Sequence, residues 1–536
     1  MVNNSNLNSN TNGVLNNQTQ RTKGVDAQNS NILAAKTIAN MIKSTLGPMG
    51  MDKMLIDSFG NTIITNDGVK ILKEMEVEHP GAKMLVDVAK TQEIEVGDGT
   101  TTAVILSGEL LERAEKLLKQ KIHPTNIVRE YKKASDKSLE LLEQIATKIS
   151  TDDEKILRQI CETAITGKAS DTSKETLSKI IFDAVKLVET KEGILKNRIK
   201  IQKAVGGNIE DSFIVKGIVL DKNFSSINMP SKKINSNILL IDFPLEVREI
   251  DASANVNINS VSEYENFLES EKNYLKSLVF KIKEIGVNTI ICQKGIDDSI
   301  SYFLAKENIQ AIRRCPRKDM EKLSLALNKK IVSSYDDILK ENLGVAGLVE
   351  KKEIMNENYI FIEKCLNPKA ITIFLKSSTI HILDELQRAV EDALGDLNAI
   401  IKSKKIVAGG GAIEIELYKN LIKWSEKFSG KKQIIIKEFS KSFLSIPKTL
   451  CENCGFDEIE TITELISNHK NKKINSGLNG LVGIVDDTLK LGIIEPINVK
   501  SQAIKSATEI SSMILRIDDI IVAKKLVNND NFSSQF

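Results

Sequence analysis

Apolar residues recur with helical spacing near both ends of the chain. Within residues 31–43 they occupy Ile32, Leu33, Ala35, Ile38, Ala39 and Ile42. A second stripe consists of Leu383, Leu386, Val390, Ala393, Leu397 and Ile400. Spacings of three and four residues place such positions on one face of a helix, so both segments are predicted to be helices with one buried face. Similar patterns predict helices in 80–149, in 152–189 and through most of the last third of the chain.

Short apolar runs replace this pattern in the middle of the chain. They are rich in Val, Ile and Phe and are bounded by turn residues, which predicts strands. The predicted strands lie at 199–204, 212–220, 236–241, 289–293, 311–314, 330–333, 359–363 and 370–375. Because they alternate with helical segments, we expect an α/β module with partly parallel strands. Two more short strands are expected near 53–57 and 61–65, inside an otherwise α-rich first part.

Composition limits the possible partners and compartments. The 536 residues are 41% hydrophobic and 27% charged, as in a soluble globular protein of about three or four domains. The net charge is +2 and aromatic residues make up 4%, so neither nucleic acid nor a membrane is an expected partner. Residues 1–18 are rich in Asn and Ser, without a basic start or an apolar run. They are expected to be a disordered leader of a cytoplasmic protein rather than a signal peptide.

The six cysteines are scattered, which argues against a disulfide framework. Cys451-Glu452-Asn453-Cys454 forms a CxxC pair, but no second pair accompanies it. Half of a zinc site is one interpretation. The helical apolar pattern around the pair favours the other, in which both are small core residues.

The segment Gly97-Asp98-Gly99-Thr100-Thr101-Thr102 carries the strongest chemical signal. A helical pattern begins directly after it, and a helix start offers free N–H groups to phosphate. Glycines allow close approach of the backbone, and Asp98 could meet the phosphates through Mg²⁺. The alternative is a helix start capped by threonine, with glycines that form a turn. The spacing alone does not separate these two interpretations.

Four other segments could contact a ligand, although each is more often simple turn chemistry. They are Gly47-Pro48-Met49-Gly50, the turn Asn66-Asp67-Gly68, Gly409-Gly410-Gly411 and Ile494-Glu495-Pro496. Asp392 lies beside the apolar stripe of its helix, as a solvated surface acid would. Neither a complete P-loop motif nor a dinucleotide fingerprint is present in the sequence.

Taken together, these motifs resemble the group II chaperonins, in particular archaeal thermosome subunits, over residues 19–525. The matching segments are Thr19-Gln20-Arg21-Thr22, Ser44-Thr45-Leu46-Gly47-Pro48, Gly50-Met51-Asp52-Lys53-Met54, Thr65-Asn66-Asp67-Gly68, Glu95 to Val104, Ile165-Thr166-Gly167-Lys168, Gly206-Gly207, Ile209-Glu210-Asp211, Cys292 to Asp298, Ala389 to Leu394, Ala408 to Ala412, Gly492 to Pro496 and Gln502 to Glu509.

The resemblance implies a multidomain α and α/β protein with the chaperonin fold. An α-helical equatorial domain would comprise 1–150 and 403–536, and would bind ATP. A small hinge, the intermediate domain, would comprise 151–218 and 368–402. An α/β apical domain, 219–367, would bind clients and carry a helical lid protrusion at about 251–283.

The resemblance also implies roles for individual residues. Asp98 would hold Mg²⁺, and Asp392 would orient or activate the attacking water, with Asp67 beside it. Lys168 would sense the γ-phosphate. The residues implied to contact the nucleotide are Leu46, Gly47, Pro48, Gly99, Thr100, Thr101, Thr102, Lys168, Gly410, Gly411 and Glu495, the last two near the ribose and adenine.

The implied function is an ATP-hydrolysing chaperone that folds unfolded proteins inside a double ring of identical or paralogous subunits, closed by a built-in lid. The alternative is a weakly hydrolysing subunit that mainly completes a hetero-oligomeric ring. The presence of all three acids, Asp67, Asp98 and Asp392, favours the first.

Overall fold

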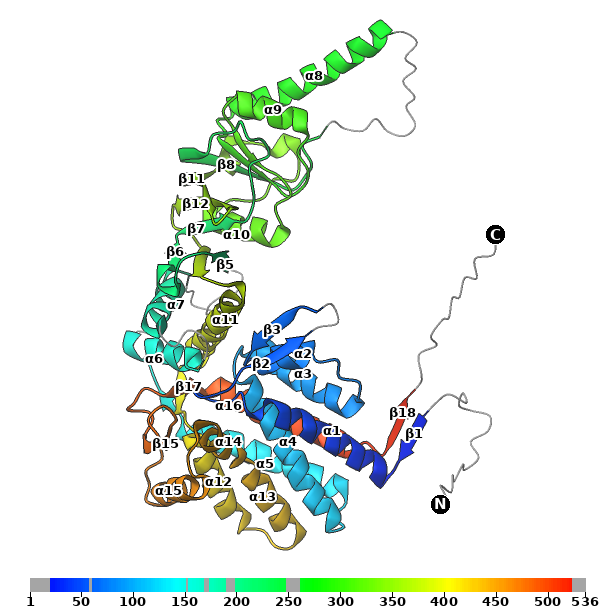
Figure 1. The fold of residues 1–536 in the computed structure, drawn as a ribbon, viewed down its shortest axis with the longest axis vertical. Coiled ribbons are helices and arrows are strands. Elements are labelled where there is room, and N and C mark those ends of the chain that lie inside the picture. The colour runs from blue at the N-terminus through cyan, green and yellow to red at the C-terminus, as the bar shows by residue number, and fades with distance from the viewer. Residues whose placement is uncertain are drawn as a thin grey trace, which may run out of the picture.

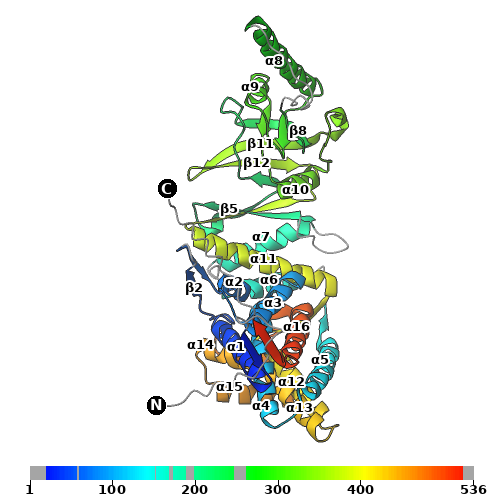
Figure 2. The ribbon, with the colours of Figure 1, turned by 90° about the vertical axis from the view of Figure 1, so that its right-hand side faces the viewer.

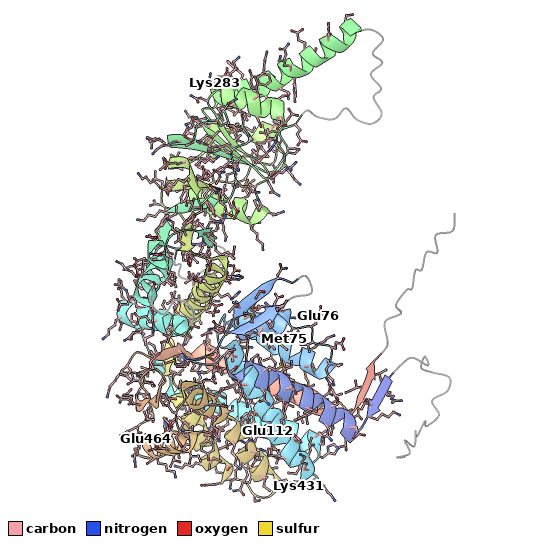
Figure 3. The ribbon with its side chains drawn as sticks, in the orientation of Figure 1. Met75, Glu76, Glu112, Lys283, Lys431 and Glu464 are labelled. Carbon is pink, nitrogen blue, oxygen red and sulfur yellow. The ribbon has the colours of Figure 1, made fainter. Side chains whose placement is uncertain are left out.

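The computed structural model describes residues 20–56, 60–150, 153–167, 173–188, 198–246 and 261–522. The molecule is elongated, with a helical body at one end, a small middle part and an α/β part at the other end (Figures 1 and 2). Lys283 and Lys431, labelled in Figure 3, lie toward opposite ends. The predicted leader, 1–18, and the start of the predicted protrusion, 251–260, lie outside the described residues.

The helical body combines the first and last thirds of the chain. Its N-terminal elements are β1 (Gln20–Lys23), α1 (Val25–Lys43), β2 (Lys53–Ile56), β3 (Thr62–Thr65), α2 (Gly68–Glu74), α3 (Pro80–Glu95), α4 (Thr100–Lys119), α5 (Pro124–Ile145) and β4 (Thr147–Lys148). Its C-terminal elements are β14 (Lys405–Ala408), α12 (Ala412–Ser425), α13 (Lys431–Ser442), α14 (Ser445–Cys454), α15 (Glu458–Lys470), β15 (Ser476–Asn479), β16 (Ile484–Asp487), β17 (Ile494–Pro496), α16 (Ile497–Leu515) and β18 (Asp519–Val522).

Helix α4 forms the axis of this body and packs against α1, α3 and α16. Its apolar residues, including Leu110, Leu111 and Ala114, are completely buried in one hydrophobic core shared by both thirds of the chain. Burial of a leucine side chain contributes about 1.5–3 kcal/mol of stability, and the helical spacing of such residues predicted this part of the fold. The start of α4, which carries the threonine motif, is thereby held on a rigid element.

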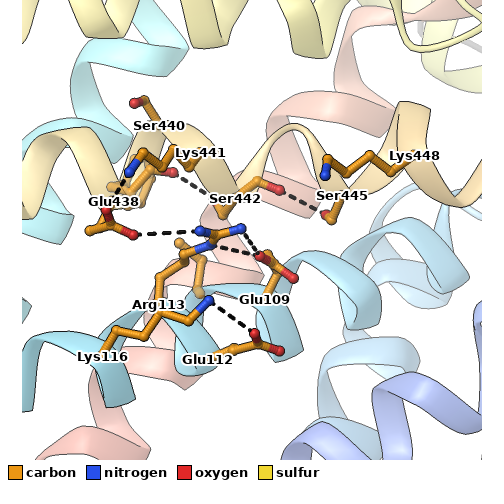
Figure 4. Close-up of polar contacts among 12 residues, drawn as sticks. Glu109, Glu112, Arg113, Lys116, Glu438, Ser440, Lys441, Ser442, Ser445 and Lys448 are labelled. Carbon is orange, nitrogen blue, oxygen red and sulfur yellow. Dashed lines mark hydrogen bonds and ion pairs between the residues drawn. The ribbon is translucent and has the colours of Figure 1, made fainter. Parts of the chain in front are cut away.

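Ion pairs fix the far side of α4 against α13 (Figure 4). The Arg113 guanidinium lies 2.7 Å from the Glu109 carboxylate on its own helix and 3.6 Å from that of Glu438 on α13. Burial alone would lower the pKa of Arg113, but these carboxylates outweigh it and raise the pKa. Because Arg113 remains charged, the contact orients α4 relative to the C-terminal third.

Short strands join the two ends of the chain. Strand β1 pairs with β18 in antiparallel register, and β14 pairs with both β4 and β17. Lys405 on β14 also forms an ion pair with Glu143 on α5. The chain therefore leaves the body after β4 and re-enters it at β14, beside the place where it left.

The middle part has its own hydrophobic core between helices and a three-stranded sheet. Its elements are α6 (Glu154–Ile165), α7 (Lys174–Val188), β5 (Ile199–Val205), β6 (Phe213–Val215), β13 (Ile371–Ser377) and α11 (Ile380–Ser403). Strand β13 is central, parallel to β5 and antiparallel to β6. The predicted stripe on α11, from Leu383 to Ile400, is fully buried. That face of α11 therefore packs in the hydrophobic core of the middle part. Another face of α11 is directed toward the helical body.

The α/β part is built on a six-stranded sheet in the order β10-β9-β8-β11-β12-β7. Strands β8, β9 and β10 are parallel, as predicted, and the others are antiparallel. The elements are β7 (Gly217–Leu220), β8 (Lys232–Ile241), α8 (Val261–Glu284), β9 (Thr289–Cys292), α9 (Asp298–Lys306), β10 (Gln310–Ile312), α10 (Arg317–Leu327), β11 (Gly344–Ile354) and β12 (Glu357–Cys365). Helix α8, the described part of the predicted protrusion, extends from the far end (Figure 1).

Two predicted strands differ from the structure, and one long strand was not predicted. The predicted strand 212–220 is two strands in different sheets, because β6 pairs with β13 and β7 with β12. The predicted strand 330–333 makes only an isolated bridge between Val332 and Ile241. Strand β11 was not predicted; its many Lys and Glu residues mask the pattern, and pairing on both sides holds it in place. Among the described residues, no helix combines the length and apolar character of a bilayer span.

Candidate functional site

A cavity of about 410 Å³ lies where the helical body meets the middle part. Every predicted site residue that the structure describes lines it, from six separate places in the sequence. These residues are Leu46, Gly47, Pro48, Asp67, Asp98, Gly99, Thr100, Thr101, Thr102, Asp392, Gly410, Gly411 and Glu495. Lys168 lies outside the described residues.

The start of α4 forms one wall. Gly99 is the N-cap residue, in the left-handed conformation with φ of 77°, and Thr100 is the first helical residue. The interpretation of a threonine-capped helix is therefore wrong, because the cap position has no side chain and makes no side-chain cap bond. The backbone also passes so close to α16 that a Cβ at Gly99 would lie 2.6 Å from a methyl group of Val499. The first-turn N–H groups of α4 thus face the cavity without a side-chain acceptor, which suits an anion.

Asp98 is positioned by a buried amide that the sequence analysis missed. The Gln92 Nε2 donates to the Asp98 carbonyl at 2.8 Å and to the Val499 carbonyl at 3.1 Å. Gln92 is fully buried on the apolar face of α3. A polar residue at a helical core position was the available signal, because buried amides are normally retained for a hydrogen-bonding task.

Asp67 begins α2 rather than forming a reverse turn as predicted. Its Oδ1 accepts a hydrogen bond from the Val69 N–H at 3.1 Å, which makes it the N-cap of the helix. The Asp67 N–H in turn donates to Thr65 Oγ1 at 3.1 Å. A Cβ at Gly68 would lie 2.7 Å from Thr101 Oγ1, so the starts of α2 and α4 nearly touch.

Asp392 reaches the cavity from the middle part, on α11. It is half-buried and lies next to the buried stripe of this helix, so the expectation of a solvated surface acid is wrong. Asp396, one helical turn later, is also buried and lines the cavity. Positions four apart share one face of a helix, and this face is directed at the body. The sequence showed where Asp392 lies on α11, but it did not single out Asp396. It also did not show that the chain folds back to place both residues in one cavity with Asp98.

Glu495 and a lysine that the sequence analysis missed close the inner end. Lys500 Nζ lies 2.8 Å from the Glu414 carboxylate and 2.9 Å from that of Glu495, and only 7% of the Lys500 side chain is exposed. Burial alone would lower the pKa of Lys500, but the two carboxylates outweigh it and hold the pKa above its ordinary value. Burial raises the pKa of Glu495, against the opposing effect of Lys500.

The segment after α1 is held by α14. Asn453 Nδ2 donates to the carbonyls of Lys43 and Leu46, at 2.9 and 2.8 Å. Cys451 is fully buried and Cys454 half-buried, and burial raises the pKa of both thiols. The pair therefore packs as small core residues of the wall, as the helical pattern favoured. Further lining residues outside the predicted set include Thr45, Asn66, Glu162, Thr163, Thr166, Lys174, Asn479 and Leu481.

The donor set fits a phosphate-bearing ligand with a divalent cation. Asp98 supplies a carboxylate next to the anion-binding helix start, and Thr100 to Thr102 add hydroxyl groups. Mg²⁺ is commonly held by one or two protein carboxylates together with substrate phosphates. The Asp392 and Asp67 residues line the same cavity from other elements, α11 and the start of α2.

Comparisons with known proteins agree across nearly the whole chain. The model of the TCP-1/cpn60 chaperonin family matches residues 38–525. A thermosome subunit of Pyrococcus horikoshii is 48% identical over 512 residues, which cover 95% of this chain and 93% of the relative. A thermosome subunit of Methanopyrus kandleri is 45% identical over 511 residues, with 95% and 94% covered. A thermosome subunit beta of Archaeoglobus fulgidus is 46% identical over 517 residues, with 96% and 95% covered.

Proposed function

Because this chain belongs to the TCP-1/cpn60 chaperonin family as a group II chaperone subunit, we propose that its cavity binds ATP and Mg²⁺ and hydrolyses the ATP to drive protein folding. One observation carries the proposal: Asp392, from the middle part, lines the same cavity as Asp98 and the start of α4. A site assembled from two parts of the molecule suits an enzyme whose chemistry is coupled to motion.

In this proposal the ATP phosphates lie against the N–H groups at the start of α4, with the hydroxyls of Thr100, Thr101 and Thr102 around them. Asp98 holds Mg²⁺, which neutralises charge on the phosphate oxygens when bound. Gln92 keeps the Asp98 backbone in place through its 2.8 Å hydrogen bond. The protein contributes mainly position and charge, as is usual in phosphoryl transfer.

Asp392 and Asp67 act on the attacking water. The water oxygen forms a bond to the γ-phosphorus, the bond between that phosphorus and the β,γ-bridging oxygen breaks, and ADP and inorganic phosphate result. Asp392 orients the water and accepts its proton. Asp67, whose Oδ1 is already engaged with the Val69 N–H, is the second acid and helps to orient the same water. Lys168 is proposed to contact the γ-phosphate.

The inner end of the cavity, which contains Glu495, is proposed to receive the nucleoside. Gly411 and Glu495 are proposed to lie near the ribose and adenine, and Leu46, Gly47, Pro48 and Gly410 to complete the contact surface. A Cβ at Gly411 would lie 2.8 Å from Pro447, so only glycine fits this close approach. The three parts of the fold are proposed to act as equatorial, intermediate and apical domains with the boundaries given above.

At the level of the assembly, we propose stacked rings of identical or paralogous subunits in the cytoplasm, which take up unfolded proteins and close with the α8 protrusion. The competing role is a weakly hydrolysing subunit that completes a hetero-oligomeric ring. The convergence of three acids on one cavity favours hydrolysis.

The test compares Asp392→Ala with wild-type protein in ATP turnover, nucleotide binding and refolding of a denatured client. We expect binding to be retained and turnover to fall by about 10²- to 10⁴-fold, the usual contribution of a general base. Glu391→Gln, at the exposed neighbouring position, is the matched control and should leave turnover unchanged. Undiminished turnover in Asp392→Ala would refute the catalytic assignment, and a stable monomer under assembly conditions would refute the ring.

A further inference from the structure

The helix that carries Asp392 is attached to the strand that leads to Asp67. Arg388 lies one turn before Asp392 on α11, and its Nη1 donates to Thr65 Oγ1 at 2.9 Å. Thr65 is the last residue of β3 and is almost fully buried. This hydrogen bond therefore crosses from the middle part to the helical body beside the cavity.

The acceptor of this bond is shared with the second acid. Thr65 Oγ1 also accepts the N–H of Asp67 at 3.1 Å. One hydroxyl oxygen thus accepts hydrogen bonds from the Arg388 guanidinium and from the Asp67 backbone N–H. Because Asp67 is the N-cap of α2, the position of this hydroxyl bears directly on the direction of the Asp67 carboxylate.

Arg388 is itself held in place. It forms an ion pair with Glu385, one turn earlier on α11, and both side chains are largely buried, at 17% and 9% exposed. A guanidinium has several fixed donors, so it can serve a carboxylate and a hydroxyl at once, which a lysine cannot do with the same geometry. The neighbouring Asn66 adds a second crossing bond, from its Nδ2 to the Gly167 carbonyl at 2.8 Å.

We propose that Arg388 is a positioning residue that, through Thr65, sets Asp392 and Asp67 relative to each other. Arg388 does not line the cavity and is proposed to act only through the two acids. The proposal rests on the ATPase function proposed above and deepens it. It names the contact that couples the position of α11 in the middle part to the position of Asp67 in the helical body. Loss of the contact should therefore impair the chemical step while leaving nucleotide binding intact.

The experiment uses the assembled full-length protein with Arg388→Gln, Thr65→Val and Thr65→Ser. The first two remove the bond, and Thr65→Ser keeps the hydroxyl. We expect kcat for ATP to fall about tenfold in the first two, the usual effect of one hydrogen bond to a charged group. The affinity of Arg388→Gln and Thr65→Val for ATP should change less than about twofold. Thr65→Ser should keep the kcat of wild-type protein. Arg317→Gln and Thr91→Val, at exposed positions on other helices, are matched controls.

Two readouts separate this proposal from the proposed function. Hydrogen exchange of the Asp67 amide, measured without nucleotide, should be faster in Arg388→Gln and Thr65→Val and unchanged in the controls, whether or not the protein hydrolyses ATP. The effects of the two variants should also be less than additive in the double variant, because both remove the hydrogen bond between Arg388 and Thr65. Unchanged exchange, additive effects, or equal losses of kcat and affinity would overturn the positioning role. Failure of wild-type protein to hydrolyse ATP would overturn the proposed function instead.

Discussion

Replacement of Lys500 by methionine tests the charge balance at the inner end of the cavity. Methionine has a similar length but no charge, so Lys500→Met would leave Glu414 and Glu495 facing each other without a cation. Lys500 Nζ lies 2.8 Å from the Glu414 carboxylate and 2.9 Å from the Glu495 carboxylate. Within the part of the chain that the structure describes, the second carboxylate oxygen of Glu414 has no hydrogen-bond partner. Lys500 is therefore the main compensation for the charge of Glu414.

The expected loss follows from the burial of all three groups. Removal of one partner from a buried ion pair costs about 3–5 kcal/mol. For a cooperative unit of about 150–250 residues, each kcal/mol lowers Tm by about 2–4 °C, which gives a decrease on the order of 10 °C at pH 7. Burial raises the pKa of Glu495, so its protonation favours the folded state as pH falls. The deficit of the variant should thus shrink between pH 7 and pH 5. The pKa of Lys500 is raised, so the contribution of Lys500 in wild-type protein is constant over this range.

The assay is differential scanning calorimetry of the assembled protein at pH 7 and pH 5. Lys505→Met, at an exposed position of the same helix, is the matched control and should behave as wild type. Glu414→Gln in the Lys500→Met background should recover part of the loss, because it removes one of the two unpaired charges. A Tm within about 2 °C of wild type at pH 7, or an equal deficit at both pH values, would refute the electrostatic reasoning.

Two other predictions concern a contact that holds one wall of the cavity and a buried hydrogen bond between α12 and α15. Asn453→Ala removes both hydrogen bonds to the segment after α1 and should weaken ATP binding about three- to tenfold, as measured by equilibrium titration. Glu452→Ala, at the exposed neighbouring position, should bind ATP as wild type does. Equal affinities of the two variants would contradict this prediction. Burial tends to raise the pKa of Glu416, but hydrogen bonds from His469 and other donors outweigh it and lower the pKa. Ionised Glu416 therefore stabilises the folded state above the pKa that it has in the unfolded chain. This stabilisation is lost as pH falls through the lower pKa that Glu416 has in the folded protein. Because Gln cannot ionise, the Tm of Glu416→Gln should decrease less steeply than that of wild-type protein as pH falls below about 4.3. Equal dependence of Tm on pH in the two proteins would contradict this prediction.

The sequence predicted those parts of the fold in which one face of an element is buried. The stripe from Leu383 to Ile400 and the helix containing Ile32 to Ile42 were predicted because period and burial coincide. The prediction was wrong for Leu33, which was placed on the buried face but is 66% exposed. Strand β11 was missed because its stability comes from pairing with β8 and β12, which are distant in the sequence. The break at Gly217 was missed for a related reason. A Cβ there would lie 1.9 Å from the Ile362 carbonyl oxygen, a contact that only the folded chain creates.

The candidate site divides in the same way. Short motifs with glycines, such as Gly99 and Gly411, could be found from sequence because their backbone requirements leave a local signature. Asp392 could be placed on a helix but not in a cavity, and only the family resemblance pointed to its role. Lys500 and Gln92 gave no local signature as site residues. Each is a polar residue in a buried helix face, and its partners lie elsewhere in the chain.

The pairing of β1 with β18 has a consequence for how this protein is made. Arg21 and Asp519, which pair across the two strands, are 498 positions apart, so the first strand leaves the ribosome long before its partner exists. At about 5–20 residues per second, the wait is roughly 25–100 s. Glu143 likewise waits for Lys405, 262 positions later. During that interval the N-terminal third carries an open strand edge and an incomplete core. The newly synthesised subunit is then itself an aggregation-prone, partly folded chain, and its folding can finish only after β18 has been synthesised.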